Sequence, residues 1–329
     1  MNPLAASPMP RAQMPNAIAA IAAAHRIVLA CHVNPDGDAL GSLLGLALGL
    51  IALGKEVVPL SSDGVPPSLT FLPGAELVRR DTDRRDFDLA IVVDSGDLTR
   101  IGNARSAIES APVVMDVDHH VTGAPFGQIR LIDGDAAATA EIVFDMLTSL
   151  DVEVTIPVAE NLLCGILTDT GSFRFRNTTP RTFQIASALT AIGASPNPIA
   201  EMVFENRPFA AQKILGRALD AMRATDGGRI VYGALTQADF AATGASDADT
   251  DGISSQFGAV RGAVVALFLR ETKEGKWRVS LRSREPFDVS AVAAQFGGGG
   301  HRLASGCTMT GTLAQAEAAL LAAVRGRLE

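Results

Sequence analysis

The sequence is poor in cysteine and in aromatic residues. Its 329 residues include three cysteines, one tryptophan and one tyrosine, and aromatic residues make up 5% of the chain. The cysteines (Cys31, Cys164 and Cys307) are odd in number and lack the paired spacing of a zinc site, which argues against a disulfide framework. We expect buried thiols in a reducing, cytoplasmic protein whose core is built from Ala, Val, Leu and Ile.

A surplus of basic residues is also absent. Lys and Arg number 28 against 36 Asp and Glu, which gives a formal net charge of -8. Proteins that bind duplex nucleic acid along its length usually carry excess positive charge, so we expect no duplex nucleic acid as a partner. Acidic residues gathered around metal ions would be an exception, because the ions cancel their charge.

Long hydrophobic runs are missing as well. The longest uncharged stretch, Ala39–Gly54, is shorter than the roughly 20 apolar residues of a membrane span, so we expect a buried helix and no membrane partner. Residues 1–15 contain several prolines and no signal-peptide pattern, and we expect a loose tail there. Hydrophobic residues still make up 47%, which indicates a folded chain, and the length favours two domains.

The first half alternates short apolar runs with helical stretches. Runs this continuous suit strands that are buried on both faces of a parallel sheet. The predicted strands are Arg26–Val33, Lys55–Leu60, Phe87–Asp94 and Pro112–Val117, and the predicted helices are Asp38–Leu53, Asn103–Ser110, Ala136–Leu150, Pro157–Thr168 and Pro180–Ile192. This pattern predicts an α/β fold, a mostly parallel sheet flanked by helices, for a catalytic domain over residues 16–192.

The second half has a different pattern. A helical linker is expected over residues 193–225, followed by a smaller α+β domain over residues 226–329. The predicted strands of this domain are Arg229–Leu235, Gly262–Arg270 and Lys276–Arg284, the last two in a hairpin, and its predicted helices are Val289–Phe296 and Leu313–Leu328.

Histidine and aspartate stand where three of the predicted strands end. His32 lies near the end of the first strand, Asp94 ends the third, and Asp118-His119-His120 follows the fourth. In open α/β sheets, ligands bind outside the carboxyl ends of the strands, so we expect these side chains to meet at one edge.

An Asp-Gly-Asp segment, Asp36 to Asp38, follows His32. Alone, such a segment before a helix is usually a turn with a helix cap. Together with the other His and Asp residues it predicts a metal site, because crowded carboxylates repel one another unless a cation neutralises them. Mixed His and Asp ligands suit Mn²⁺, Fe²⁺ or Zn²⁺, and their number allows two ions that share a carboxylate.

Four segments resemble the ordered motifs of the DHH phosphoesterases: His32–Ser42, Val93-Asp94, Asp118–His120 and Leu167–Phe173. In the second half, Ser280–Ser283 and Gly297–Gly306 resemble the DHH-associated C-terminal domain of the first subtype. The resemblance covers nearly the whole chain. The compact two-domain length is similar to the branch of oligoribonucleases (nanoRNases) and 3′-phosphoadenosine 5′-phosphate phosphatases.

The resemblance implies two Mn²⁺ ions, with Mg²⁺ or Co²⁺ as substitutes. By position, His32, Asp36 and Asp169 would hold one ion, Asp38 and His119 the other, and Asp94 would bridge both. The implied catalytic residues are Asp94 and His120, and His120 would contact the scissile phosphate or move a proton. Asp118 would orient a ligand histidine. The residues implied in substrate binding are Ser280, Arg282, Ser283, Gly298, Gly299, Gly300 and His301.

One position departs from the family pattern. The family often has Ser-Thr before the glutamate of the Asp133–Glu141 segment, and Ala138 stands in the serine position. This departure argues against a hydroxyl role there. We expect the segment to form a turn and a helix cap.

The implied activity is a hydrolase of phosphate esters, an exoribonuclease and nucleotide phosphatase. A hydroxide that bridges the two ions would attack phosphorus in line. The implied substrates are short single-stranded RNA of a few nucleotides and 3′-phosphoadenosine 5′-phosphate, a mononucleotide bisphosphate.

Alternatives remain open at this point. The chain could be a phosphodiesterase for cyclic dinucleotides or linear pApA, a nuclease for long nucleic acids, or a catalytically silent nucleotide-binding regulator. The six implied metal-ligand positions are filled, which argues against the silent regulator, and the glycine run before His301 argues against a pyrophosphatase. Helices of the first domain could support a homodimer.

Overall fold

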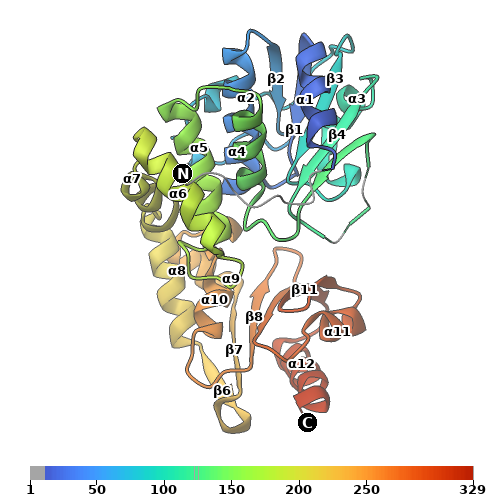
Figure 1. Cartoon of the computed structure of the whole chain (residues 1–329). Coiled ribbons are helices and arrows are strands. Elements are labelled where there is room, and N and C mark those ends of the chain that lie inside the picture. Colours follow the sequence, from blue (N-terminus) through green and yellow to red (C-terminus); the bar gives the residue numbers. More distant parts are fainter. Residues whose placement is uncertain (1–11, 122, 125, 329) are drawn as a thin grey trace. The chain divides into compact units, whose positions relative to one another are not determined.

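A computed structural model of the chain describes residues 12–121, 123–124 and 126–328. Contacts within the chain divide it into two units, with the boundary between Asn206 and Arg207 (Figure 1). Residues 1–11 of the expected tail lie outside the described residues. The end of that tail is helical, because helix α1 (Met14–Ala23) begins there with a proline in its first turn.

The first unit is built on a five-stranded sheet in the order β2-β1-β3-β4-β5, with every pair parallel. The predicted α/β fold with a parallel sheet is thus confirmed. Strands β1 and β3 are neighbours although helix α2 (Gly37–Ala52) and strand β2 lie between them in the sequence, so the strand order reverses between β1 and β3. Such a reversal is the point where α/β sheets bind ligands. The strands are β1 (Arg26–Ala30), β2 (Glu56–Leu60), β3 (Leu89–Val93), β4 (Val114–Asp118) and β5 (Ile129–Ile132).

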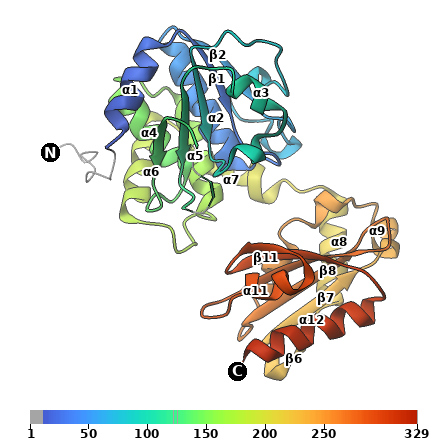
Figure 2. The same cartoon turned by 90° about the vertical axis from the view of Figure 1, so that its right-hand side faces the viewer.

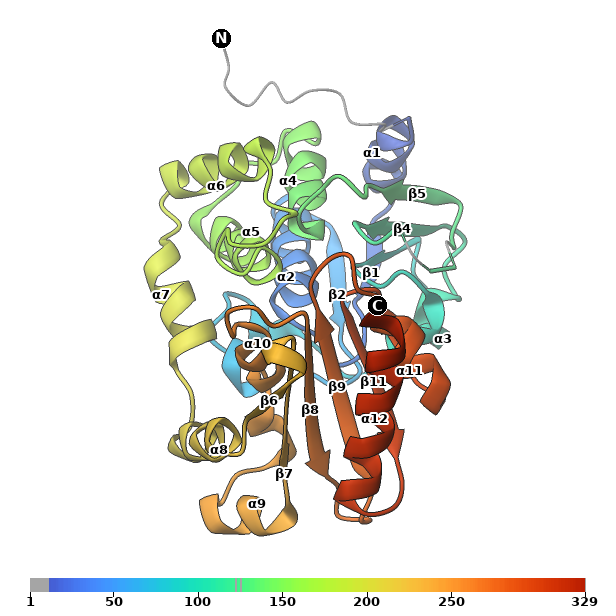
Figure 3. The same cartoon turned by 90° about the horizontal axis from the view of Figure 1, so that it is seen from below.

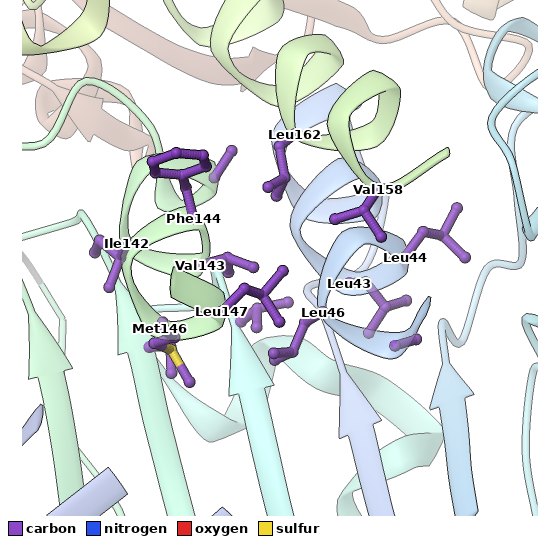
Figure 4. Close-up of a cluster of buried hydrophobic side chains, with 14 of the residues drawn as sticks. Leu43, Leu44, Leu46, Ile142, Val143, Phe144, Met146, Leu147, Val158 and Leu162 are labelled. Atoms are coloured by element: carbon purple, nitrogen blue, oxygen red, sulfur yellow. The ribbon is translucent and has the colours of Figure 1, made fainter. Parts of the chain in front are cut away.

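Helices cover both faces of this sheet. Along β1, Ile27 and Leu29 pack into one core cluster with α2, α4 and α5, whereas Val28 and Ala30 pack into a second cluster with α3. Figure 4 shows side chains of α2, α4 and α5 gathered in the first cluster. Burial on both faces explains the continuous apolar runs. The helices are α2 (Gly37–Ala52), α3 (Arg105–Ile108), α4 (Thr139–Ser149), α5 (Ile156–Asp169), α6 (Pro180–Ile192) and α7 (Pro196–Ala200).

Helix α2 packs unusually close to α5. A Cβ atom on Gly41 of α2 would lie 2.3 Å from the backbone oxygen of Asn161, so only glycine fits at this crossing. On α5, a Cβ atom on Gly165 would lie 2.6 Å from Asp38 Oδ1. The close packing brings the first turn of α2 and the last turn of α5 to the same place, and both turns carry predicted site residues.

The second unit is a smaller α+β domain, as predicted. Its sheet has the order β10-β11-β9-β8-β7-β6, and the predicted hairpin is the antiparallel pair β8 and β9. Helices α11 and α12 cover one face of this sheet, and α8 and α10 contribute to the cluster on the other (Figures 2 and 3). The elements are α8 (Phe209–Asp220), β6 (Arg223–Thr225), β7 (Ile230–Leu235), α9 (Gln237–Thr243), α10 (Ile253–Gly258), β8 (Val265–Glu271), β9 (Trp277–Ser283), α11 (Ser290–Ala293), β10 (Gly299–His301), β11 (Ala304–Met309) and α12 (Leu313–Leu328).

Some elements differ from the prediction. The glycine run contributes strand β10, which pairs with β11, a strand that the sequence did not predict. The edge strand β5 also escaped prediction, and the last residues of the expected helical linker form β6. These strands are short, so pairing with their neighbours decides their conformation rather than local propensity. Among the described residues, no helix is long and apolar enough to cross a membrane.

Candidate metal centre

The structure brings the predicted His and Asp residues together at the reversal point of the first sheet. His32 follows β1 and Asp94 follows β3, and His32 Nε2 lies 3.5 Å from Asp94 Oδ2. His119 follows β4, Asp169 ends α5, and His119 Nε2 lies 3.1 Å from Asp169 Oδ2. Residues far apart in the sequence therefore meet because strand ends and helix ends converge at this edge.

Asp94 is at the centre of the cluster. Its side chain is 2% exposed, and its backbone has a φ of 56°, a conformation that a non-glycine residue seldom adopts. While Oδ2 faces His32, Oδ1 lies 3.6 Å from His119 Nε2 and 3.5 Å from His120 Nδ1. Burial acts to raise the pKa of Asp94, but the hydrogen bond with His32 and the charges of the three histidines lower it. A carboxylate whose two oxygens face different histidines is suited to bridging two cations.

The histidines present their Nε2 atoms to the carboxylates. His32 Nδ1 lies 2.8 Å from the backbone oxygen of Val33, and His119 Nδ1 lies 3.4 Å from that of Ala136, so in both rings Nδ1 is assigned as the donor. In neutral rings this leaves Nε2 as an electron-pair donor that faces carboxylate oxygens. His119 Nε2 is buried and faces Asp169 Oδ2 and Asp94 Oδ1. A cation between these atoms would satisfy both sides, so the donor set fits a divalent metal ion.

The electrostatics of the cluster agree with this fit. Burial and the neighbouring Asp94 and Asp169 raise the pKa of Asp36, and the same causes raise that of Asp38 well above its usual range. Burial acts to lower the pKa of His119, yet Asp169, Asp38 and Asp94 raise it to about 10. Asp169 also stands at the C-terminal end of α5, where the helix dipole disfavours negative charge. Bound cations would remove the repulsion among these carboxylates.

Two groups of side chains that contain the implied ligands could each hold one ion. His32, Asp36 and Asp94 have ligand atoms within 4.8 Å of one another, and the same limit defines a second group of Asp38, His119 and Asp169. The six implied ligands are therefore all in these two groups. Asp169 is grouped with Asp38 and His119, whereas the resemblance implied a place with His32 and Asp36.

His120 and Asp118 form a third such group with Asp94 and His119. The buried Asp118 carboxylate accepts hydrogen bonds from the backbone N–H of His120 at 3.0 Å and from its Nδ1 at 2.8 Å. Asp118 raises the pKa of His120 and orients its ring, so the histidine that it orients is His120. The His120 side chain is 29% exposed, so part of its ring is accessible to a ligand.

The first turn of α4 also belongs to the site, which the sequence did not predict. The fully buried Asp38 carboxylate accepts from the backbone N–H of Thr139 at 2.6 Å, from that of Ala140 at 3.0 Å and from Ser42 Oγ at 3.1 Å. The first N–H groups of a helix have no partner within it, so Asp38 satisfies them. Thr139 Oγ1 in turn donates to Asp94 Oδ1 at 3.0 Å. Ala138 has no hydroxyl group, but the next residue, Thr139, supplies one to Asp94.

Replacing Thr139 by valine tests this positioning role. The change removes the hydroxyl that orients Asp94 but keeps the side-chain shape and the backbone N–H that Asp38 binds. We expect the affinity for Mn²⁺, measured by isothermal titration calorimetry, to fall about 10- to 100-fold. Thr139→Ser keeps the hydroxyl and should retain the affinity of the original chain. Equal affinities for the valine variant and the original chain would contradict the role.

The residues implied in substrate binding lie in the second unit, on β9 and around β10. Arg282 is half-buried, and its Nη1 donates to the backbone oxygen of Leu281 at 3.0 Å. Ser283 Oγ donates to the backbone oxygen of Phe287 at 2.8 Å, which gives it a structural role. Gly298 packs so close to β11 that a Cβ atom would lie 2.2 Å from the oxygen of Gly306.

The glycine run differs from an open phosphate-binding loop. The N–H groups of Gly297 and Gly298 donate to the backbone oxygens of Ala294 and Ala293, so these two groups are already used. Gly299, Gly300 and the exposed His301 form strand β10. Ser280, Arg282 and His301 therefore remain the polar side chains available to a ligand among the residues implied there.

Comparison with known proteins gives matches over both units. Residues 26–166 match the model of the DHH family, N-terminal domain, and residues 227–329 match that of the DHHA1 domain. The bifunctional oligoribonuclease and PAP phosphatase NrnA of Thermus thermophilus is 36% identical over 304 residues, which cover 92% of this chain and 90% of the relative. The protein of the same name from Bacillus subtilis is 28% identical and covers 86% of this chain and 89% of its own.

A solved structure is similar over the same length. An exopolyphosphatase-related protein from Bacteroides fragilis has a TM-score of 0.90 at 26% sequence identity, with 96% of each chain covered.

Proposed function

Because this chain belongs to the DHH family and is therefore a phosphoesterase, we propose that it hydrolyses short oligoribonucleotides and 3′-phosphoadenosine 5′-phosphate. The observation that carries the proposal is the convergence of six metal-ligand candidates around the buried Asp94. The relatives named as oligoribonuclease and PAP phosphatase align with more than four fifths of the length of this chain, which supports the choice of substrates.

The proposed cofactors are two Mn²⁺ ions. His32, Asp36 and Asp94 would hold one ion, and Asp38, His119 and Asp169 the other, with Asp94 shared between them. Such ions, when bound, lower the pKa of water and neutralise the charge that develops on a reacting phosphate. The mixed His and Asp donors support Mn²⁺ over an ion that prefers oxygen ligands alone.

Residues of each unit have their own proposed role in substrate binding. His120, oriented by Asp118 and partly exposed, contacts the scissile phosphate or donates a proton to the leaving ribose oxygen. Ser280, Arg282 and His301 of the second unit bind phosphate oxygens, because a guanidinium group forms paired, charge-assisted hydrogen bonds with phosphate. The net charge of -8 agrees with a small substrate. Bound metal ions would offset the acidic residues at the site, whereas a long nucleic acid would need a basic surface beyond it.

The cysteines support a cytoplasmic location. Cys31, Cys164 and Cys307 are all buried and unpaired. Free buried thiols are typical of proteins in a reducing compartment.

A substrate panel with Mn²⁺ tests the proposed function. The panel contains 3′-phosphoadenosine 5′-phosphate, RNA of two to five nucleotides, linear pApA, cyclic di-AMP, a long single-stranded RNA and a duplex. We expect hydrolysis of the first two kinds of substrate, little turnover of the long strand and none of the duplex. Preferred turnover of cyclic di-AMP or of the long strand would overturn the substrate choice. Bound metal without turnover of any substrate would overturn the proposed activity in favour of a nucleotide-binding regulator.

A further inference from the structure

Strand β9 carries a row of polar side chains on one face. Trp277, Val279 and Leu281 pack into the cluster with α11 and α12. Side chains alternate along a strand, so Arg278, Ser280 and Arg282 face the opposite side of the sheet. Ser280 and Arg282 belong to the proposed substrate site, whereas Arg278 has no role in it.

Arg278 lies next to a second arginine and a threonine. The strand register places Arg270 of β8 and Thr308 of β11 directly opposite Arg278, one on each side. Residues opposite one another in a sheet share a face, so these three side chains form a group. Together with Ser280 and Phe296 they line a cavity of about 410 Å³. This volume accommodates a phosphate group with part of a nucleoside.

The two arginines converge on one anion. Arg278 Nη1 lies 2.9 Å from Asp247 Oδ2, and Arg270 Nε lies 3.4 Å from Asp247 Oδ1. Asp247 begins a short 3-10 helix (Asp247–Thr250), and its side chain is 56% exposed. Arg270 is held in place, because its Nε faces Asp247 and its Nη1 donates to Thr250 Oγ1. The side chain of Arg278 is 57% exposed, so its guanidinium group can offer paired donors to an oxyanion that takes the place of Asp247.

The spacing along β9 matches a short nucleic-acid strand. Arg278 and Arg282 are four residues apart, which corresponds to about 13 Å at about 3.3 Å per residue. Neighbouring phosphates of one RNA strand are separated by six covalent bonds, so a strand of a few nucleotides is long enough to span this length. One short RNA could place separate phosphates at the two arginines, whereas a mononucleotide bisphosphate has only the two phosphates of a single nucleoside.

We propose that Arg278 and Arg270 form a second phosphate subsite, which binds a distal phosphate of an oligoribonucleotide held at Arg282. Asp247 occupies this subsite as a competing anion and is displaced or shared when the RNA binds. The subsite would determine how well the protein uses oligoribonucleotides relative to 3′-phosphoadenosine 5′-phosphate. This inference rests on the proposed function, which it deepens by naming a determinant of substrate length.

Two substitutions with opposite expected effects test the subsite. Arg278→Met keeps the apolar stem but removes the charge, and we expect kcat/KM for a pentanucleotide to fall about tenfold or more through KM. The same variant should hydrolyse 3′-phosphoadenosine 5′-phosphate as the original chain does. Asp247→Asn removes the competing anion and should lower KM for the pentanucleotide. Lys273→Met, which removes an exposed charge from the neighbouring turn, is the matched control and should change neither substrate.

A binding measurement separates failure of the subsite from failure of the proposed function. The affinity for a labelled pentanucleotide is measured by fluorescence anisotropy in EDTA over a range of salt concentrations, where hydrolysis does not interfere. Loss of one phosphate contact should reduce the slope of log K against log salt by about 0.7 in Arg278→Met. An unchanged slope and affinity, or equal losses on both substrates, would overturn the subsite even if the original chain is active. A reduced slope in a chain that hydrolyses neither substrate would support the subsite and overturn only the proposed function.

Discussion

Replacing Asp94 by asparagine is expected to reduce hydrolysis by at least about 10³-fold, equivalent to about 4 kcal/mol of activation free energy. Asparagine keeps the size of the side chain but removes the negative charge that faces both His32 and His119. Because the two groups of metal ligands meet at this carboxylate, its loss weakens both ion sites at once. Initial rates on 3′-phosphoadenosine 5′-phosphate and on a dinucleotide, measured with saturating Mn²⁺, check the expectation.

A neighbouring aspartate gives the matched control for this substitution. Asp97 caps a short helix three residues later, where its carboxylate accepts from the backbone N–H of Thr99 at 2.7 Å. Asp97→Asn changes the same chemical group but leaves the cluster intact, so its rates should equal those of the original chain. Rates for Asp94→Asn within tenfold of the original would show that Asp94 does not join the two sites.

Asp38→Ala is expected to lower the free energy of unfolding by about 3–5 kcal/mol. The Asp38 carboxylate is fully buried, and the substitution leaves Ser42 Oγ and the backbone N–H groups of Thr139 and Ala140 without an acceptor. Each buried donor without a partner costs about 1–3 kcal/mol. Urea denaturation monitored by circular dichroism measures the change.

The effect of Asp38 can be separated from that of a single hydrogen bond. Ser42→Ala removes one donor and keeps the carboxylate with its two backbone partners, so we expect a loss of only about 1 kcal/mol. If Asp38→Ala were no more destabilising than Ser42→Ala, the carboxylate would not anchor α4 as described. The Asp38 variant should also lose hydrolytic activity, because the same side chain is a ligand candidate of the second ion.

The sequence predicted the edge of the sheet where the site lies, for a simple geometric reason. His32, Asp94 and His119 follow parallel strands. The carboxyl ends of parallel strands lie at the same edge of the sheet, whatever the order of the strands. Asp169 was different, because an aspartate at the end of a helix does not by itself indicate a site. Only the family motif marked Asp169 as a ligand candidate, and the motif implied a place with His32 and Asp36, whereas the structure groups it with Asp38 and His119.

Other parts of the site depend on contacts between distant segments. The Thr139 hydroxyl reaches Asp94 across 45 residues, and the Thr139 N–H reaches Asp38 across 101 residues. Neither contact leaves a periodic pattern in the sequence. The glycine run was also unpredictable as a strand, since glycine has a low intrinsic preference for strands and only its pairing with β11 fixes β10.

Anomalous diffraction at the manganese edge, from crystals grown with Mn²⁺, shows whether the His and Asp cluster holds two metal ions that share Asp94. We expect two peaks roughly 3.5–4 Å apart, one beside His32 and Asp36 and one beside His119 and Asp169, with Asp94 in contact with both. A single peak, or peaks that do not touch Asp94, would refute the shared metal centre.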